Sequence, residues 1–167
     1  MKETTLQPFV TYLQGLQDDR GALAALRRGL GQDPSAAPEM YRYVVPWVPQ
    51  DAEAWREAAY YLLASLFALH PGNATEGNLG AHFARAAAQG SHQAIERRFS
   101  TLLAAHPDDL PVYLRQAVGF LKSKGIAINW HQLFEDMLHW NRPNHSVQKA
   151  WARAFWGTAT AVTTEQA

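Results

Sequence analysis

The segment from Asp51 to Leu69 constrains the fold more than any other part of the chain. Asp51 is a suitable N-cap, so we expect a long helix that begins there and ends at His70-Pro71-Gly72. A helix that is apolar on nearly all sides is normally buried by several neighbours. The sequence therefore predicts that other elements surround this helix. The apolar side chains that spread around its circumference are Tyr60, Tyr61, Leu62, Leu63, Leu66, Phe67 and Leu69.

The surrounding elements are also predicted to be helices. No stretch alternates between polar and apolar residues over more than three or four positions, as a half-buried strand would. Apolar residues instead recur at helical spacing within separate segments. Gly, Pro and capping residues lie between these segments. Further helices are expected at residues 6–16, 20–30, 39–45, 79–89, 92–105, 109–124, 130–141 and 146–157.

The fold class that follows is all-α, a helical bundle of roughly seven to nine helices. It forms either one unit or two small packed sub-bundles. Residues 1–157 are expected to be a single all-helical domain, because a chain of this length can bury a core without disulfides. The polar stretch 158–167 is expected to be a disordered tail.

Composition and missing motifs exclude several classes of protein. The chain has no cysteine, so disulfides, thiolate zinc sites and a cysteine nucleophile are absent. It lacks the apolar core of a secretion signal, and its best apolar run, 58–69, is too short to cross a membrane. We therefore expect a soluble cytoplasmic protein. Because phosphate-cradling loops, nucleophile elbows and dinucleotide motifs are also missing, we expect neither an enzyme nor a cofactor.

One alternative is a metal-dependent hydrolase. His131, Glu135 and His139 lie four residues apart on one expected helix, and the first two could share a metal ion. The pattern lacks the H-E-x-x-H spacing, and no second helix supplies an identifiable further ligand. We favour an exposed face of His and Glu side chains, with His131 at the edge of the buried side, and we expect no metal.

The charge of the chain is balanced overall but unevenly distributed. Lys plus Arg number 15 and Asp plus Glu number 15, so the net charge is zero. Residues 1–80 carry a net charge of −3 and residues 81–167 a net charge of +3. Eleven of the 15 basic residues are arginine, which suits bidentate contacts with phosphate. This asymmetry supports a polar partner on the C-terminal half.

Basic residues form stripes on three of the last four expected helices. At 100° per residue, each stripe lies on the polar side of its helix or at the border of that side. A cationic pair beside a Trp suits a phosphate with a stacked base. A solvated face whose Trp docks on another helix or subunit is the other interpretation, and both stay open. The stripes consist of Arg97 with Arg98, Arg115 with Lys122, and Lys149 with Arg153 and Trp156.

A further basic pair, Arg27-Arg28, lies in the expected helix 20–30. Asp18 and Asp19 are close in sequence, so local ion pairing is a better explanation of this pair than a ligand site.

The order of several segments resembles a known family. The segments are Arg97-Arg98-Phe99 with Leu102-Leu103, Tyr113-Leu114-Arg115-Gln116-Ala117-Val118 with Leu121-Lys122, Ile128-Asn129-Trp130 with Leu133, Asp136, Leu138 and Trp140, and Val147-Gln148-Lys149-Ala150-Trp151-Ala152-Arg153 with Phe155. On these segments the chain resembles the CasB family, the small subunit of the type I-E CRISPR Cascade surveillance complex. The resemblance is strongest over residues 95–156 and extends more loosely to the N-terminal helix, Arg27-Arg28 and the helix from Tyr60 to His70.

The resemblance implies an all-α non-enzyme present as two copies along the complex, in contact with the repeated backbone subunit and the large subunit. It implies basic surfaces that help to hold the guide RNA–target DNA hybrid and the displaced DNA strand. Carried over by position, Arg98, Arg115 and Lys122 are the first candidates for contacts with nucleic-acid phosphates. The second candidates are Arg27, Arg28, Lys124, Lys149 and Arg153.

We therefore hypothesise a non-catalytic subunit of a guide-RNA complex. It would bind phosphates electrostatically and leave sequence recognition to base pairing by the guide. The alternative is a purely structural adaptor without direct nucleic-acid contact. Trp156 and the turn at Trp47 would then be its exposed docking surfaces.

Overall fold

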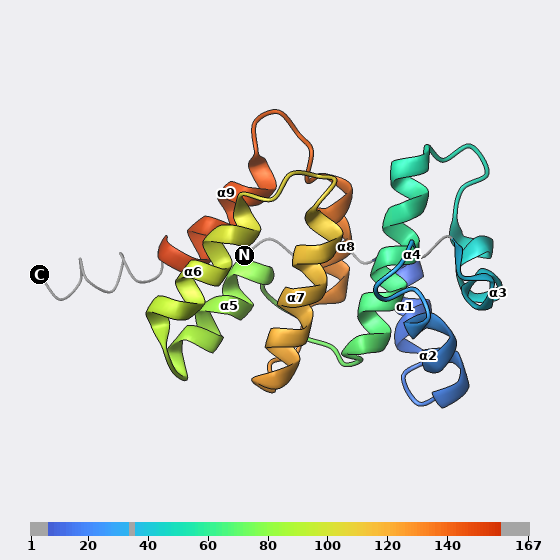
Figure 1. Ribbon diagram of the computed structural model, residues 1–167, viewed down its shortest axis with the longest axis horizontal. Helices are drawn as coiled ribbons and strands as arrows, with labels where there is room; N and C mark the ends of the chain where they lie inside the picture. Colours follow the sequence, from blue (N-terminus) through green and yellow to red (C-terminus); the bar gives the residue numbers. More distant parts are fainter. Residues whose placement is uncertain (1–6, 34–35, 158–167) are drawn as a thin grey trace, which may run out of the picture.

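The computed structural model describes residues 7–33 and 36–157, and within these ranges the fold is all-α, with nine α-helices and no strand (Figure 1). The predicted fold class is therefore confirmed. The expected tail, 158–167, lies outside the described residues. The helices are α1 (Pro8–Gln14), α2 (Arg20–Arg27), α3 (Tyr41–Val44), α4 (Ala54–Leu69), α5 (Leu79–Ala88), α6 (His92–Leu103), α7 (Leu110–Ser123), α8 (Trp130–Leu138) and α9 (Ser146–Ala152).

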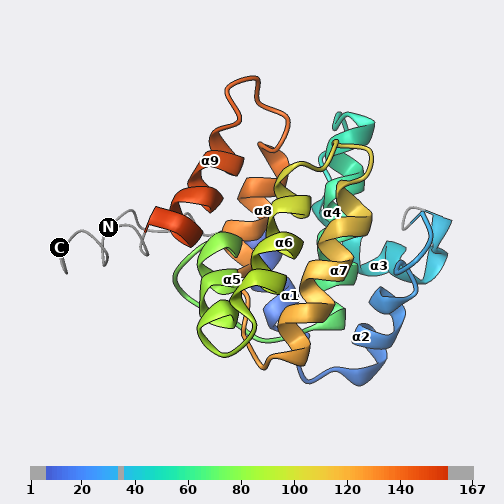
Figure 2. The ribbon, with the colours of Figure 1, turned by 60° about the vertical axis from the view of Figure 1, so that its left-hand side comes forward.

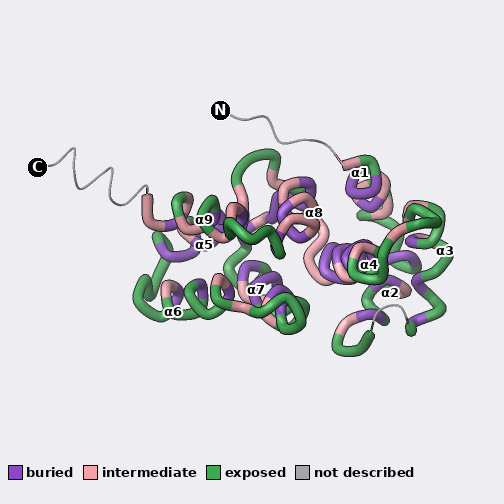
Figure 3. Tube along the Cα trace, turned by 90° about the horizontal axis from the view of Figure 1, so that it is seen from above, coloured by how far each residue is buried: buried purple, intermediate pink, exposed green. Residues whose placement is uncertain are grey.

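Helix α4 lies between two groups of helices. Helices α1 to α3 are on one side of it and α5 to α9 on the other (Figures 1 and 3). It packs against α2 and α3 in the first group and against α7 and α8 in the second. All its residues from Ala59 to Ala68 are buried except Leu62, which is half-buried. The prediction that other elements surround this helix is thus confirmed, and the buried side chains of both groups form one continuous core.

The expected start of α4 is wrong. The helix begins at Ala54 with Glu53 at the N-cap position, and no side chain caps it. Asp51 lies instead within a turn in which the N–H of Ala52 donates to the carbonyl of Pro49. The first helical hydrogen bonds therefore run from Arg56 and Glu57 to the carbonyl of Glu53, beyond the reach of an Asp51 cap.

Asn129 with Gln132 has the residue types and spacing of a capping box at the start of α8, but the box is only half formed. The Asn129 side chain accepts a hydrogen bond from the N–H of Gln132 at 3.2 Å. The Gln132 side chain does not return to the N–H of Asn129 but donates to Asp136 at 2.9 Å. The N–H of Asn129 donates instead to Nε2 of His82, at 3.0 Å. This bond ties α8 to α5 inside the core.

Two buried titratable groups hold the C-terminal helices together. His82 accepts the bond from Asn129 in its neutral form, and burial lowers the pKa of His82 to about 4. Asp136 accepts a bond from Nε1 of Trp151 at 2.7 Å, which ties α8 to α9. Burial raises the pKa of Asp136 to about 6, although its hydrogen bonds from Trp151 and Gln132 act in the opposite direction.

Helices α5 and α9 touch through their backbones at Gly80. A side chain at this position would collide with the carbonyl of Trp151. Gly119, in α7, has no neighbouring atom within 4 Å of the place where its side chain would be. One helical glycine is thus required by packing and the other is not.

Gly80→Ala should destabilise the fold by about 2 kcal/mol or more, because α5 and α9 must separate to admit the methyl group. Gly119→Ala should instead stabilise it by up to about 1 kcal/mol, because alanine loses less backbone entropy in a helix. Urea unfolding followed by circular dichroism measures both. Equal effects of the two substitutions would contradict the close contact of α5 with α9.

Asp136→Asn should change the pH dependence of stability. Between pH 3.8 and about 6 the folded state binds a proton at Asp136 that the unfolded state does not, so folding is weakened as the pH rises through this window. In the Asn variant this loss of stability with rising pH does not occur. Its unfolding free energy should match that of the parent at pH 4 and exceed it by up to about 3 kcal/mol above pH 6.

His82→Gln provides the control of opposite sign. In the parent the unfolded state binds the extra proton between about pH 4 and 6.5, so His82 makes the fold less stable as the pH falls. Removing the imidazole should therefore lessen acid destabilisation. If the unfolding free energies of the parent and both variants changed with pH in the same way, neither group would be buried as described.

Candidate nucleic-acid interface

Two cations are held around one aromatic ring where α6 meets α7. The guanidinium carbon of Arg98 lies 4.6 Å from the centre of the Phe120 ring, and Nζ of Lys124 lies 5.8 Å from it. The Phe120 ring itself stacks on buried Phe83, with centroids 5.7 Å apart. Cation–π contact therefore positions both charges at the surface and leaves their hydrogen-bond donors available.

Helices α6 and α7 lie side by side (Figure 2). Residues of both helices line a groove of about 320 Å³, and its lining includes Arg98 and Phe83, which both contact Phe120. No carboxylate is among its lining residues. The groove is therefore suited to an anion and unsuited to a cation. Its polar lining consists of Arg97, Arg98, Thr101, Tyr113 and Gln116.

The cations of this surface have no acidic partner in the described part of the chain. Within residues 7–33 and 36–157, the ion pairs are His92 with Glu96 and His106 with Asp108, and none involves an Arg or Lys. Lys122 is also exposed, in the last turn of α7. We call Arg98, Lys122 and Lys124 the α6–α7 basic surface.

Arg115 lies on a different surface from Lys122, although both belong to α7. Seven residues separate them, a distance of about 10 Å along a helix. The Arg115 guanidinium lies against Gly31, where a side chain would begin 2.7 Å from Nη1. Arg115 therefore lines a cleft that opens toward the N-terminal half and not the groove beside α6.

The basic stripe of the last helix is separate from the α6–α7 basic surface. Lys149 and Arg153 are exposed, but α9 lies on the α8 side of the molecule, opposite α6 and α7 (Figure 3). Residues Arg153–Gly157 form a π-helical turn, which rotates the side chains that follow it relative to a regular helix. Trp156 therefore packs on Phe99 and donates to Glu96 at 3.2 Å. The exposed Trp156 that the adaptor alternative required is not found, and the other interpretation of this stripe, a Trp that docks on another helix, is confirmed.

The turn at Trp47 is also not the exposed surface that the alternative required. Trp47 is half-buried, with its ring 5.1 Å from that of Tyr12 and 6.1 Å from that of Phe9. The covering residues lie far away in sequence, so helical periodicity gave no sign of them.

One residue of the N-terminal basic pair, Arg27, has a structural role. Nη1 of Arg27 donates to the carbonyl of Ala68, 3.2 Å away at the end of α4. The carboxyl end of a helix favours positive charge. Arg27 thus caps α4, and the expected local pairing with Asp18 or Asp19 does not occur. Arg28 is exposed.

The expected exposed face of His and Glu side chains is wrong, because His131 is buried and Glu135 and His139 are half-buried. Nδ1 of His131 accepts a hydrogen bond from the N–H of Gln7 at 2.9 Å, and burial lowers the pKa of His131. His139 bonds the carbonyl of Glu135 through its own Nδ1. Across the described residues, no group of three or more His, Cys, Asp or Glu side chains is placed to hold a metal ion. In the same residues, no helix is long and apolar enough to span a membrane.

Sequence reasoning missed the aromatic support of this interface. Phe120 and Lys124 are four residues apart in sequence, so their contact could have been predicted from helix geometry. The contact of Arg98 with Phe120 joins two helices and has no local signal. Arg97, which the sequence places away from the apolar face, is part of the groove wall.

Comparison with known proteins points to one family. Residues 22–156 match the family described as CRISPR-associated protein Cse2. The CRISPR-associated protein Cse2 of Thermus thermophilus is 36% identical over 155 residues, which cover 89% of this chain and 88% of that protein.

Solved structures give the same result. The crystal structure of M. ruber CasB is similar with a TM-score of 0.77 at 30% identity, covering 98% of this chain and 100% of that one. A chain in a structure described as a CRISPR RNA-guided surveillance complex is similar with a TM-score of 0.81 at 26% identity, covering 95% of each chain.

Arg27→Ala should lower the free energy of unfolding by about 1 kcal/mol, because the last carbonyls of α4 lose a charged donor. Arg28→Ala is the matched control, since this neighbour is exposed and should change stability by less than about 0.5 kcal/mol. Urea titrations of both variants measure the difference. If both variants were as stable as the parent, the helix-capping role of Arg27 would be wrong.

Proposed function

The chain belongs to the CRISPR-associated Cse2 family, and on this premise we propose that it is a non-catalytic subunit of an RNA-guided surveillance complex in antiviral defence. It binds nucleic acid without sequence preference and stabilises the guide RNA–target DNA hybrid and the displaced DNA strand. The observation that carries this proposal is the α6–α7 basic surface, where Arg98 and Lys124 are held on Phe120 without an acidic partner among the described residues.

The mechanism is electrostatic. Each Arg or Lys that contacts a phosphate releases condensed counterions from the nucleic acid, and this release favours binding most strongly at low salt. Because Phe120 holds the Arg98 guanidinium in place, less side-chain entropy is lost when a phosphate binds. Such contacts fix the position of a strand and carry no sequence information. Sequence recognition is left to the guide.

The remaining basic residues form separate and secondary contacts in this proposal. Lys149 and Arg153 offer a second exposed pair on α9. Arg28 offers a single charge on the N-terminal half, beside Arg27, which is bonded to α4. A strand that runs over the assembled complex can contact these surfaces in turn. The partners are guide RNA, both DNA strands, the other protein subunits and a second copy of this chain.

Arg98→Glu combined with Lys122→Glu should weaken binding of the isolated chain to single-stranded DNA and guide-like RNA by about tenfold or more at low salt. The slope of log affinity against log salt should fall by about 1.4, the value for two lost phosphate contacts on a single strand. Fluorescence anisotropy over a salt series measures both quantities.

The control is Arg20→Glu combined with Arg42→Glu, two exposed arginines in α2 and α3. This variant changes the net charge equally, so an equal loss of binding would show an effect of total charge and not of the α6–α7 basic surface. The structural adaptor remains the alternative. It is favoured if the parent binds no strand at low salt while the assembly of the complex depends on this chain.

A further inference from the structure

A large cleft separates the two halves of the molecule on one side of α4. Its volume is about 1070 Å³, above the range of about 300–1,000 Å³ that is usual for small-molecule sites. The N-terminal half of α4 and the turn Gly29–Asp33 form one wall. The α6–α7 loop, the first turns of α7 and the end of α8 with the residues that follow it form the other.

The cleft exposes large apolar side chains. Trp55 is 52% exposed and Val112 is 58% exposed, and these two lining residues lie on opposite walls. Half-buried Leu30, Leu62 and Leu138 continue the apolar lining. An apolar surface of this kind on a folded chain marks an interaction site.

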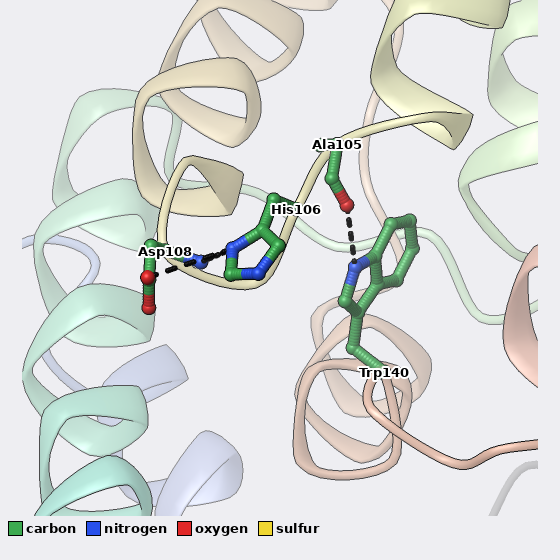
Figure 4. A network of polar contacts seen from close by, with 4 residues as sticks. All are labelled: Ala105, His106, Asp108 and Trp140. Carbon is green, nitrogen blue, oxygen red and sulfur yellow. Dashed lines mark hydrogen bonds and ion pairs between the residues drawn. The ribbon is translucent and has the colours of Figure 1, made fainter.

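Hydrogen bonds fix the aromatic residues of both walls. Nε1 of Trp55 donates to Glu53 at 2.7 Å, which leaves the ring faces of its indole to the cleft. On the opposite wall, Nε1 of Trp140 donates to the carbonyl of Ala105 at 3.3 Å, so the end of α8 is tied to the α6–α7 loop (Figure 4). The cleft is therefore formed before any partner binds.

The cleft carries charges of both signs, because Asp33, Asp108, Arg115 and Arg142 all line it. Asp108 lies 3.5 Å from Nδ1 of His106 (Figure 4), and Asp33 is also engaged in an interaction. Arg115 and Arg142 are exposed and have no carboxylate within ion-pairing distance in the described residues. The cleft thus combines an apolar lining with two arginines and two aspartates, a mixture that suits a polypeptide better than a polyanion.

We propose that this cleft binds a polypeptide segment of another protein subunit of the complex, one that presents a large apolar side chain to Trp55 and Val112 and a carboxylate to Arg115 or Arg142. The inference rests on the proposed function only in that the chain works within a complex. Trp and Arg are the residues that dominate binding energy in protein interfaces. Single-stranded nucleic acid suits the cleft less well, because two aspartates line it and would repel phosphates.

The proposal separates the roles of two residues on α7. Arg115 pairs with a protein carboxylate in the cleft, whereas Lys122 contacts phosphate on the α6–α7 basic surface. Sequence alone placed both in one stripe.

Val112→Asp tests the cleft directly, and Val45→Asp is the matched control. Val45 is equally an exposed valine, at 52%, and does not line the cleft. The measurement is the binding of the purified chain to a complex that has been assembled from all the other subunits. Val112→Asp should weaken this binding about tenfold or more and leave the affinity of the isolated chain for single-stranded DNA unchanged. Val45→Asp should change neither. Arg115→Glu should also weaken assembly.

A photo-crosslinking residue at position 112 identifies the occupant. Labelling of a protein subunit in the assembled complex supports the proposal. Labelling of an RNA or DNA strand, or unchanged assembly of the Val112→Asp variant, would overturn it. A failure of the proposed function would give another result. The double variant Arg98→Glu with Lys122→Glu would then bind nucleic-acid strands as well as the parent, while Val112→Asp would still block assembly.

Discussion

The burial of α4 is the constraint on which the rest of the structure depends. Because the helix is apolar on all sides between Ala59 and Ala68, no single neighbour can cover it. The chain responds by placing α2 against it on one side and α7 and α8 on the other. The first turn of α4, by contrast, is exposed. The two halves meet along the apolar part of the helix and remain apart at its N-terminal end, and this is why the cleft forms there.

The sequence predicted what local geometry determines. Helical periodicity located the helices, and the Asn129 cap and the central role of α4 follow from residue types and spacing alone. The errors have non-local causes. Trp156 is covered because a π-helical turn shifts its direction, and Arg27 finds its partner 41 residues away at the end of α4. A helical wheel gives the direction of a side chain from its own axis but not the neighbour that it meets.

The same limit applies to the candidate interface. The family resemblance made Arg98 and Lys122 first candidates for phosphate contact and Lys124 a second candidate, and the structure places all three at the surface of α6 and α7 or just beyond. It could not show that Phe120 supports two of them, because one of these contacts joins separate helices. Nor could it separate Arg115 from Lys122, since Arg115 meets Gly31, whose φ is +82°, in a turn far away in sequence.

The zero net charge of the chain bears on how the two proposed surfaces work together. A neutral chain is not attracted to a polyanion over long distances, and beyond about 8–10 Å salt screens what attraction its basic surfaces provide. A few phosphate contacts alone give weak, salt-sensitive binding. Docking through an apolar cleft does not depend on salt in this way and holds the basic surface close to the strands. The effective concentration of nucleic acid at the α6–α7 basic surface then rises without any additional phosphate contact. In this proposal, apolar docking supplies the proximity that the charge of the chain cannot.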